Sequence, residues 1–415
     1  MPGDRRADLG LGSRGVPFEQ IGQSAVKRLW RQKTDTQIPV SRTSPCHYLP
    51  MLTAIISDLH LGTVSGADVT RLAAARARLV EAIAPAERVV VLGDMLEMRE
   101  QRAVSVLEVA APFLSDLGEA TAGKQLVIVP GNHDHELVGP ALDRARLRGR
   151  ATLEADSTFP ADEGELVRSV VARMPATEVL LAYPGIWLRD DVFATHGHYL
   201  DRHLTVPRME CVLASAIARF GGAGRNGGAP TPDDYEAALA PIYAFAYSAV
   251  QDGESKAVTR GGKLSRNVWR RSNPTGRRTL AGLAIGRLAI PGAVWGLNRM
   301  GLGPFHPDIS PTELRRAGLR AMAGVVRSLG IEAQHVIFGH THRPGPLPGD
   351  ADEWQLPDGT QLTNTGSWLY ESVFIRGEGP SNPYWPGGIT WLDDDGPPRL
   401  TNVLRDLDLG PRGPV

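Results

Sequence analysis

Cysteine is nearly absent from this 415-residue chain, since Cys46 and Cys211 are the only two and cannot form a disulfide framework. Net charge is nearly absent as well: 45 Lys and Arg face 46 Asp and Glu, so the whole chain implies no strongly charged partner. The apolar segment 280–302 contains Arg287 and falls short of the roughly 20 apolar residues that span a membrane. Residues 1–50 lack the apolar core of a secretory signal. These absences favour a cytoplasmic protein.

Five short apolar runs, each bounded by glycine or polar residues, are typical of buried central strands in an α/β fold. They cover residues 54–56, 89–92, 126–129, 192–194 and 335–338. The polar stretches that follow them are Asp58-Leu59-His60, Gly93-Asp94, Gly131-Asn132-His133-Asp134, Thr195-His196-Gly197-His198 and Gly339-His340-Thr341-His342. Because α/β proteins place their sites on loops at strand ends, we expect these five stretches to meet at one place.

The side chains of these stretches predict a metal centre. Carboxylate, imidazole and amide oxygen together suit divalent manganese, iron or zinc. The stretches hold too many such groups for one ion, so two ions that share one carboxylate are the simplest interpretation. Two adjacent ions can hold a hydroxide between them and bind a phosphoryl oxygen, because the metal charge stabilises hydroxide near neutral pH. The predicted reaction is hydrolysis of a phosphoester or phosphoanhydride.

The ordered set Asp-x-His, Gly-Asp, Gly-Asn-His-Asp, His-Gly-His and Gly-His-x-His resembles the calcineurin-like metallophosphoesterases over residues 52–400, with an interruption at 205–311. The resemblance implies an α/β fold, a four-layer α/β/β/α sandwich of two mixed sheets with a helical insertion. It also implies two divalent ions as cofactors, with manganese favoured over iron or zinc, and a metal-bridging hydroxide that attacks phosphorus.

Carried over position by position, the resemblance assigns a role to each polar residue. One metal would be held by Asp58, His60 and His342. The other would be held by Asn132, His196 and His340, and the bridge between them would be Asp94. The leaving oxygen would be protonated by His133, whose imidazole would be oriented by Asp134.

Five neighbouring side chains receive lesser roles. Glu97 is interpreted as a support for a ligand rather than a ligand itself, because seven better ligands are present. His198 and Arg343 are interpreted as substrate contacts. We expect His135 to be solvated and His203 to lie on the surface.

The same pattern suggests the domain boundaries. We expect a metallophosphoesterase domain at 51–204 and 312–407, a mainly helical insertion at 205–311, a disordered extension at 1–50 and a frayed tail at 408–415. Helices are predicted at 67–83, 103–117, 162–173, 208–220, 233–250 and 311–329. Further strands are predicted at 179–183, 191–195, 371–375, 388–392 and 399–403.

The insertion contains a basic run followed by an apolar one. Residues 254–278 hold eight Lys or Arg and one Glu, and residues 280–302 are rich in apolar and small side chains. Three interpretations stay open: a helical cap with a solvated basic face, a peripheral contact of residues 256–302 with the anionic inner membrane surface, or a groove for nucleic-acid phosphates. Few aromatic residues interleave the basic run, which argues against stacking on single strands.

Within the family, Asp58-Leu59-His60-Leu61-Gly62 and Thr341-His342-Arg343-Pro344 are similar to the UDP-2,3-diacylglucosamine pyrophosphatases. This similarity implies a phosphorylated small-molecule substrate that is nucleotide-linked or lipid-linked. Those enzymes typically have Arg at the position of His133, and Gly-Asp where this chain has Gly197-His198. The alternatives are a DNA exo- or endonuclease of the recombination-repair type, which also has Asp-x-His-Leu-Gly and Gly-Asn-His-Asp, and a non-catalytic scaffold with the same fold.

Deleting residues 1–50 is expected to leave metal-dependent hydrolysis unchanged, because their polar composition is typical of disorder rather than of a packed element. Rates with an aryl phosphodiester and the soluble yield of the truncated protein, measured beside the full chain, test this prediction. An insoluble or inactive product would contradict it.

Overall fold

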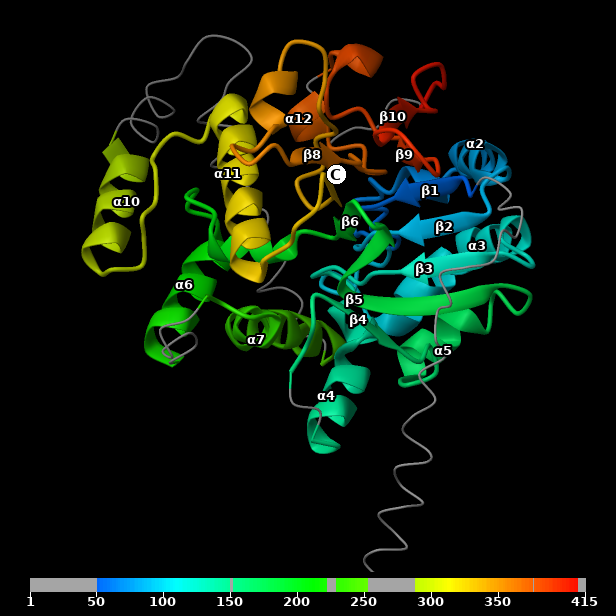
Figure 1. Ribbon diagram of the computed structural model, residues 1–415, viewed down its shortest axis with the longest axis horizontal. Coiled ribbons are helices and arrows are strands. Elements are labelled where there is room, and N and C mark those ends of the chain that lie inside the picture. The colour runs from blue at the N-terminus through cyan, green and yellow to red at the C-terminus, as the bar shows by residue number, and fades with distance from the viewer. Residues whose placement is uncertain (1–50, 150–151, 222–228, 253–287, 376, 410–415) are drawn as a thin grey trace, which may run out of the picture. The chain divides into compact units, whose positions relative to one another are not determined.

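The computed structural model describes residues 51–149, 152–221, 229–252, 288–375 and 377–409 (Figure 1). The predicted disordered extension 1–50, the basic run 254–278 and residues 410–415 of the predicted frayed tail lie outside the described residues. The described parts contain ten strands and the helices that cover them.

The strands lie side by side in the order β10-β9-β1-β2-β3-β5-β6-β7-β8, with β4 paired to β5. Their bounds are β1 Thr53–Ile56, β2 Arg88–Val91, β3 Gln125–Ile128, β4 Asp156–Phe159, β5 Glu178–Arg189, β6 Val192–Thr195, β7 His335–Phe338, β8 Gln361–Asn364, β9 Gly388–Leu392 and β10 Arg399–Asn402. Neighbouring strands run parallel in the group β1-β2-β3-β5 and in the group β6-β7-β8. The strand pairs that involve β4, β9 or β10, and the pair of β5 with β6, are antiparallel.

The 12-residue strand β5 belongs to two mixed sheets. Its first part, Glu178–Leu181, pairs with β3, whereas Gly185–Arg189 pairs with β6. Side-chain alternation sends Ile55 of β1 and Ile337 of β7 into one buried cluster between the sheets, and their sequence neighbours point to the outer faces. The predicted fold class is confirmed, with the refinement that the two mixed sheets share one strand.

Helices cover the outer faces of both sheets (Figure 1). Their bounds are α2 Ala73–Ile83, α3 Ala103–Ala120, α4 Gly139–Leu147, α5 Glu165–Val171, α6 Met209–Gly221, α7 Pro232–Gln251, α10 Ile290–Arg299, α11 Pro311–Leu329 and α12 Ser372–Ile375. Phe113 of α3 packs in one apolar cluster with Val89 of β2. Met322 of α11 packs in a second cluster with Phe338 of β7 and Tyr235 of α7. The strand ends between these layers are therefore held from both sides.

Strand β5 is longer than the predicted strand 179–183, because it continues through Pro184 and Gly185. The sequence pair Pro-Gly suggests a break, but a Cβ at residue 185 would collide with the ring of Phe193 on β6. Glycine at this position permits close packing between paired strands rather than ending one of them.

Two other predicted elements differ from the structure. The predicted helix 67–83 is divided, because Leu72 is extended (φ −75°, ψ 124°) between a 3-10 turn and α2. Residues 371–375 were predicted as a strand, and that prediction is wrong. The amides of Phe374 and Ile375 donate to the carbonyl of Glu371, which starts the single helical turn α12.

The described part of the predicted insertion 205–311 consists largely of α6, α7 and α10. Helix α7 begins with a capping box, in which Thr231 and Asp234 satisfy each other's backbone amides. Near α10, Trp295 and Met300 are exposed. No helix in the described parts of the chain is long and apolar enough to cross a bilayer.

Candidate metal centre

Five residues beyond the ends of β1, β2 and β7 have a positive φ, which L residues rarely adopt. They are Asp58, His60, Asp94, His340 and His342, with φ between 44° and 66°. No other non-glycine residue among the described ones has a positive φ. Such backbone costs about 1–3 kcal/mol per residue and collects at functional sites, so the strand ends mark a site by conformation as well as by composition.

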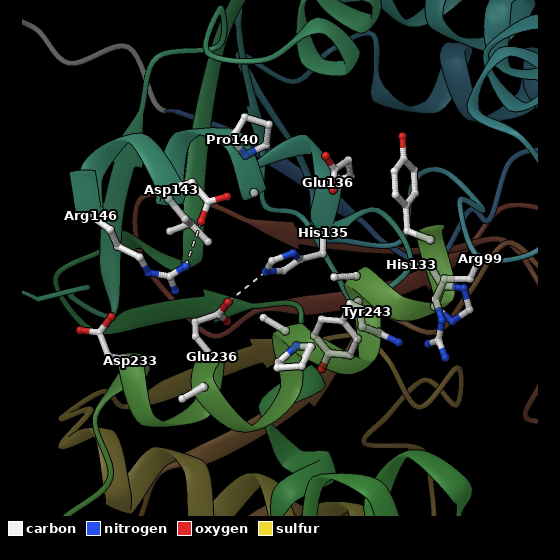
Figure 2. Close-up of a pocket in the computed structure, with 18 residues that line it drawn as sticks. Arg99, His133, His135, Glu136, Pro140, Asp143, Arg146, Asp233, Glu236 and Tyr243 are labelled. Carbon is white, nitrogen blue, oxygen red and sulfur yellow. Dashed lines mark hydrogen bonds and ion pairs between the residues drawn. The ribbon is translucent and has the colours of Figure 1, made fainter. Parts of the chain in front are cut away.

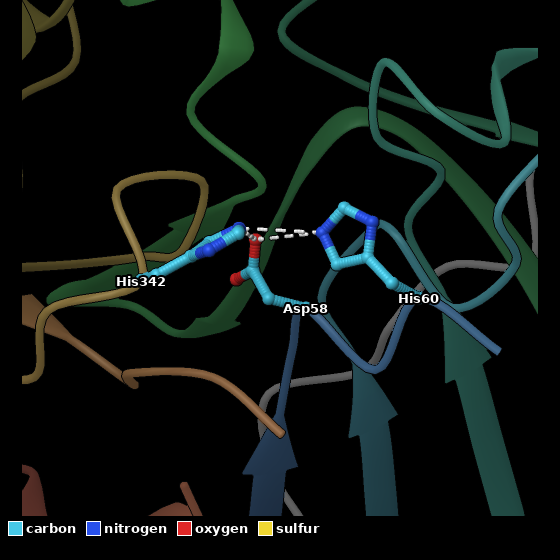
Figure 3. Close-up of side chains that lie close together, drawn as sticks. All are labelled: Asp58, His60 and His342. Atoms are coloured by element: carbon cyan, nitrogen blue, oxygen red, sulfur yellow. Dashed lines mark hydrogen bonds and ion pairs between the residues drawn. The ribbon is translucent and has the colours of Figure 1, made fainter. Parts of the chain in front are cut away.

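Asp58, His60 and His342 form a first cluster (Figure 3), although 282 residues separate the two histidines. Nε2 of His342 lies 3.2 Å from Oδ1 of Asp58 and 3.2 Å from Nε2 of His60. Asp58 is fully buried, and its carboxylate accepts the backbone amide of His340 and the hydroxyl of Ser57. Three potential ligand atoms therefore converge from the β1 and β7 loops.

Both histidines of the first cluster point Nε2 inward because a carboxylate holds Nδ1. Nδ1 of His60 donates to Glu97 at 2.9 Å, and Nδ1 of His342 donates to Glu371 at 2.6 Å. The two Nε2 atoms then present lone pairs to each other, and these repel unless a cation or a proton lies between them. Carboxylate support of this kind is typical of histidines that bind metal, so the cluster fits a divalent ion.

Asp94, His196 and His340 form a second cluster, with Asn132 beside it. Nδ1 of His196 donates to a backbone carbonyl at the end of β2, so its buried Nε2 points at Oδ2 of Asp94, 3.2 Å away. Nε2 of His340 lies 3.1 Å from Asp201, and its Nδ1 lies 3.1 Å from Oδ1 of Asn132. When Nε2 donates to Asp201, Nδ1 and the amide oxygen are both acceptors, and a cation between them satisfies both.

Asp94 joins the two clusters. Its Oδ2 lies 3.5 Å from Nε2 of His60 and 3.2 Å from Nε2 of His196, while its Oδ1 accepts the amide of His133 at 2.8 Å. A Cβ at Gly131 would collide with this carboxylate, so the loop after β3 can approach it only with glycine there. One carboxylate oxygen is thus placed between two sets of potential ligands.

The buried acids attract positive charge to the site. Burial alone lowers the pKa of His196, but the charges of Asp94 and Asp58 outweigh burial and raise that pKa to about 9. Burial is also outweighed at His342, where Glu371 and Asp58 raise the pKa to about 10. Histidines that would otherwise carry protons here are suited to divalent cations, which supply the same charge.

His133 is oriented by Glu97, and the prediction that Asp134 orients it is wrong. Nδ1 of His133 lies 2.8 Å from Glu97, and its side chain is 24% exposed, so part of the ring is open to solvent. The carboxylate of Asp134 instead accepts the backbone amides of Asp94, Met95, Leu96 and Gly131. Asp134 therefore connects the loop after β2 to the loop after β3 through hydrogen bonds. Glu97 contacts Nδ1 of both His60 and His133 and so orients both rings.

Two carboxylates of the site, Asp201 and Glu371, were missed in the sequence. Asp201 is 3% exposed, and although burial opposes it, the charge of His340 lowers its pKa to about 2. Its position in the polar stretch after His196 is a signal that could have found it. Glu371 follows no strand that was recognised, and only the folded chain brings it to His342.

The two predicted substrate contacts have other partners in the structure. His198 is buried beside His196, and its Nε2 lies 2.9 Å from the hydroxyl of Tyr183. The guanidinium of Arg343 pairs with Asp350 and lies over the ring of Trp354. Nδ1 of His198 has no hydrogen-bond partner among the described residues, and the substrate roles of both side chains stay predictions.

His135 and His203 are also placed differently from the prediction. Nε2 of His135 lies 3.0 Å from Glu236 on α7, so this histidine is paired rather than solvated. His203 is partly buried, and its Nε2 lies 2.5 Å from the hydroxyl of Tyr235. The sequence showed no partner for either residue, because both partners are on α7, beyond a Gly-rich segment.

A cavity of about 720 Å³ begins at Asn132 and His133 and extends between α4 and α7 (Figure 2). Arg99 and Tyr243 line it near His133, and Arg146 lines its other end. This volume is within the range of small-molecule sites. The cavity therefore gives an organic group room next to the two clusters.

One family model and several solved structures are similar to this chain. Residues 51–236 match the family model described as calcineurin-like phosphoesterase. No curated protein matches the chain. Among solved structures, a dimetal phosphatase from Danio rerio has 12% identity and a TM-score of 0.31, with 82% of this chain and 92% of that chain covered. A cold-active protein tyrosine phosphatase of a Shewanella species has 14% identity and a TM-score of 0.26, with 82% and 75% covered.

The fold, the two ligand clusters and the family match together indicate the class of this protein. Two clusters of acidic and imidazole ligands share Asp94 at the strand ends of a mixed α/β sandwich. Residues 51–236 are similar to the calcineurin-like phosphoesterase family. Together, the matched family and the ligand clusters support a dinuclear phosphoesterase.

Proposed function

We propose that this protein is a metal-dependent hydrolase of phosphoesters or phosphoanhydrides that works with two divalent ions. The observation that supports this most directly is Oδ2 of Asp94, which faces His60 of one cluster and His196 of the other. When bound, the ions would activate a water molecule and neutralise phosphoryl oxygens. The family resemblance favours manganese over iron or zinc, and the mixed oxygen and nitrogen ligands suit all three.

The chain's own residues position the substrate and move a proton. The leaving oxygen would take its proton from His133, whose ring is partly open beside the cavity. Glu97 holds that ring through Nδ1 and leaves Nε2 for the substrate. The cavity has room for more than a phosphoryl group, so we propose a nucleotide-linked or lipid-linked substrate.

Metal removal tests the proposal directly. Chelation followed by desalting is expected to abolish hydrolysis of bis(p-nitrophenyl) phosphate, and added Mn²⁺ is expected to restore it, because the ligand clusters are incomplete without cations. Bound metal is measured by mass spectrometry beside the rate. Full activity in protein that has lost its metal would contradict the proposal, and turnover of DNA above every small substrate would favour the nuclease alternative.

We also propose that residues 256–302 contact anionic membranes peripherally. The exposed Trp295 and Met300 supply apolar side chains next to the basic run in sequence. The protein is expected to float with anionic liposomes at low salt and less so at high salt, and deletion of residues 263–301 should end flotation. Neutral liposomes are the control. No flotation at low salt would favour a plain helical cap.

A further inference from the structure

His135 is held in one orientation by a buried carboxylate from α7. Its Nε2 lies 3.0 Å from Glu236, which is 1% exposed. The same carboxylate accepts the hydroxyls of Tyr183 at 2.6 Å and Tyr199 at 2.8 Å. Three donors around one carboxylate favour its ionised form, so Glu236, which also lines the cavity, is a fixed acceptor at Nε2 of the imidazole.

This contact decides which nitrogen of His135 carries the proton. With an ionised acceptor at Nε2, the neutral imidazole keeps its proton there, and Nδ1 becomes a hydrogen-bond acceptor. Nδ1 lies beside Gly139 in the cavity wall and has no hydrogen-bond partner among the described residues (Figure 2). The cavity therefore contains an oriented acceptor that the protein itself does not use.

The surroundings of His135 show what kind of group fits the cavity. Helices α4 and α7 contribute charged side chains to the cavity, which are Asp143, Arg146, Asp233 and Glu236. They also contribute the apolar side chains Pro140, Leu142, Ala240, Pro241, Ala244 and Tyr247. Tyr243 lies with its ring 5.5 Å from that of His135, and its buried hydroxyl has no partner among the described residues. The apolar part of this wall, together with the acceptor on His135, suits a mainly apolar group that carries a hydrogen-bond donor at one point.

We propose that His135 determines substrate specificity by accepting a hydrogen bond, through Nδ1, from a hydroxyl group on the organic part of the substrate. The inference rests on the proposed hydrolase function, because the cavity starts at Asn132 and His133 beside the metal clusters. It narrows the substrate class to phosphoesters or phosphoanhydrides whose organic group is largely apolar and carries a hydroxyl. Glu236 is the positioning residue that sets the tautomer.

Matched substrates test this on the full chain with Mn²⁺. The probes are p-nitrophenyl phosphodiesters of linear diols of increasing length, each with a free terminal hydroxyl or with that hydroxyl O-methylated. The same p-nitrophenolate leaves from every probe, so the leaving group does not vary. At the best-fitting length, the free hydroxyl is expected to raise kcat/KM about tenfold over the methyl ether, mainly through KM.

Two variants separate the hydrogen bond from a packing effect. His135→Phe keeps a ring but removes the acceptor, and the hydroxyl-to-ether ratio is expected to fall to about one. Glu236→Gln can still accept from both tyrosines and presents an amide donor to Nε2, which moves the imidazole proton to Nδ1. A hydroxyl and an ether oxygen can both accept from Nδ1–H, so the hydroxyl-to-ether ratio of this variant is also expected to fall to about one. The matched control His306→Phe changes an exposed histidine and should keep the wild-type ratio.

The possible results distinguish the two proposals. Hydrolysis without discrimination at any chain length, or a preference that survives in a folded His135→Phe protein, overturns this inference alone. A Glu236→Gln protein that melts like wild type and keeps the wild-type preference also overturns it. Absence of hydrolysis with both the diol probes and bis(p-nitrophenyl) phosphate overturns the proposed hydrolase function, and the inference with it.

Discussion

Replacing Asp94 by alanine is expected to lower Mn²⁺-dependent hydrolysis of bis(p-nitrophenyl) phosphate by at least about 1000-fold. An oxygen of Asp94 faces His60 and His196 at once, so its loss weakens both ion sites in one step. His340→Ala should have a similar effect, because His340 connects Asn132 to Asp201 in the second cluster. Initial rates and the metal content of each purified protein are the measurements.

The control for this prediction is an aspartate outside the site. Asp162 is exposed in the segment before α5, and Asp162→Ala should keep the wild-type rate and metal content. Thermal melting shows whether Asp94→Ala is folded, since removing repulsion among buried acids can even stabilise a metal-free site. A folded Asp94→Ala protein with a near-normal rate would defeat the dinuclear mechanism.

His133→Ala is expected to lower the rate by about 100-fold or more for a poor leaving group, and by much less for p-nitrophenolate. The reason is that a poor leaving oxygen needs a proton as its bond to phosphorus breaks, whereas p-nitrophenolate departs without one. His133 contacts the metal clusters through its backbone amide to Asp94, its ring contact with Glu97 and an edge contact with the ring of His60. It is none of the assigned ligands, so bound metal should be retained. A series of aryl phosphodiesters with graded leaving groups measures the difference.

Two comparisons make this second prediction specific. His306→Ala, at an exposed histidine, should leave the dependence on leaving group unchanged. In His133→Ala the logarithm of the rate should fall more steeply as the pKa of the leaving alcohol rises. Equal losses for good and poor leaving groups, with full metal content, would rule out proton donation by His133.

Much of the fold could be predicted because the central strands have a recognisable local sequence pattern. The β-branched runs at 54–56, 89–92 and 335–338 are short, apolar and followed at once by polar loops, which is typical of buried strands. The run 371–375 also ends in apolar residues, Val373, Phe374 and Ile375, but its residues 372–375 form α12, in which two amides donate to the carbonyl of Glu371. Short apolar runs alone do not separate strand from helix.

Some residues of the site could be predicted from their position after a strand, whereas their contacts with distant residues could not. Asp58, Asp94 and His196 follow strands directly, so their positions could be predicted from the chain alone. The supporting contact of Glu97 with His133 could not, because it depends on how the β2 and β3 loops cross. The error over Asp134 has the same cause: the two residues are neighbours in sequence, yet Asp134 turns to backbone amides of another loop.

The sequence by itself determined which chemical groups are present and that they follow strand ends, because strand periodicity and loop composition are local properties. Only the tertiary structure decided which nitrogen of each histidine faces inward, since that choice belongs to distant partners such as Asp201 for His340 and Glu371 for His342. It also decided that the cavity begins at His133 and that Glu236 orients His135 in its wall. Folding fixes the hydrogen bond at one nitrogen of each imidazole ring, and that bond determines which nitrogen is left unprotonated to bind a cation or accept a hydrogen bond.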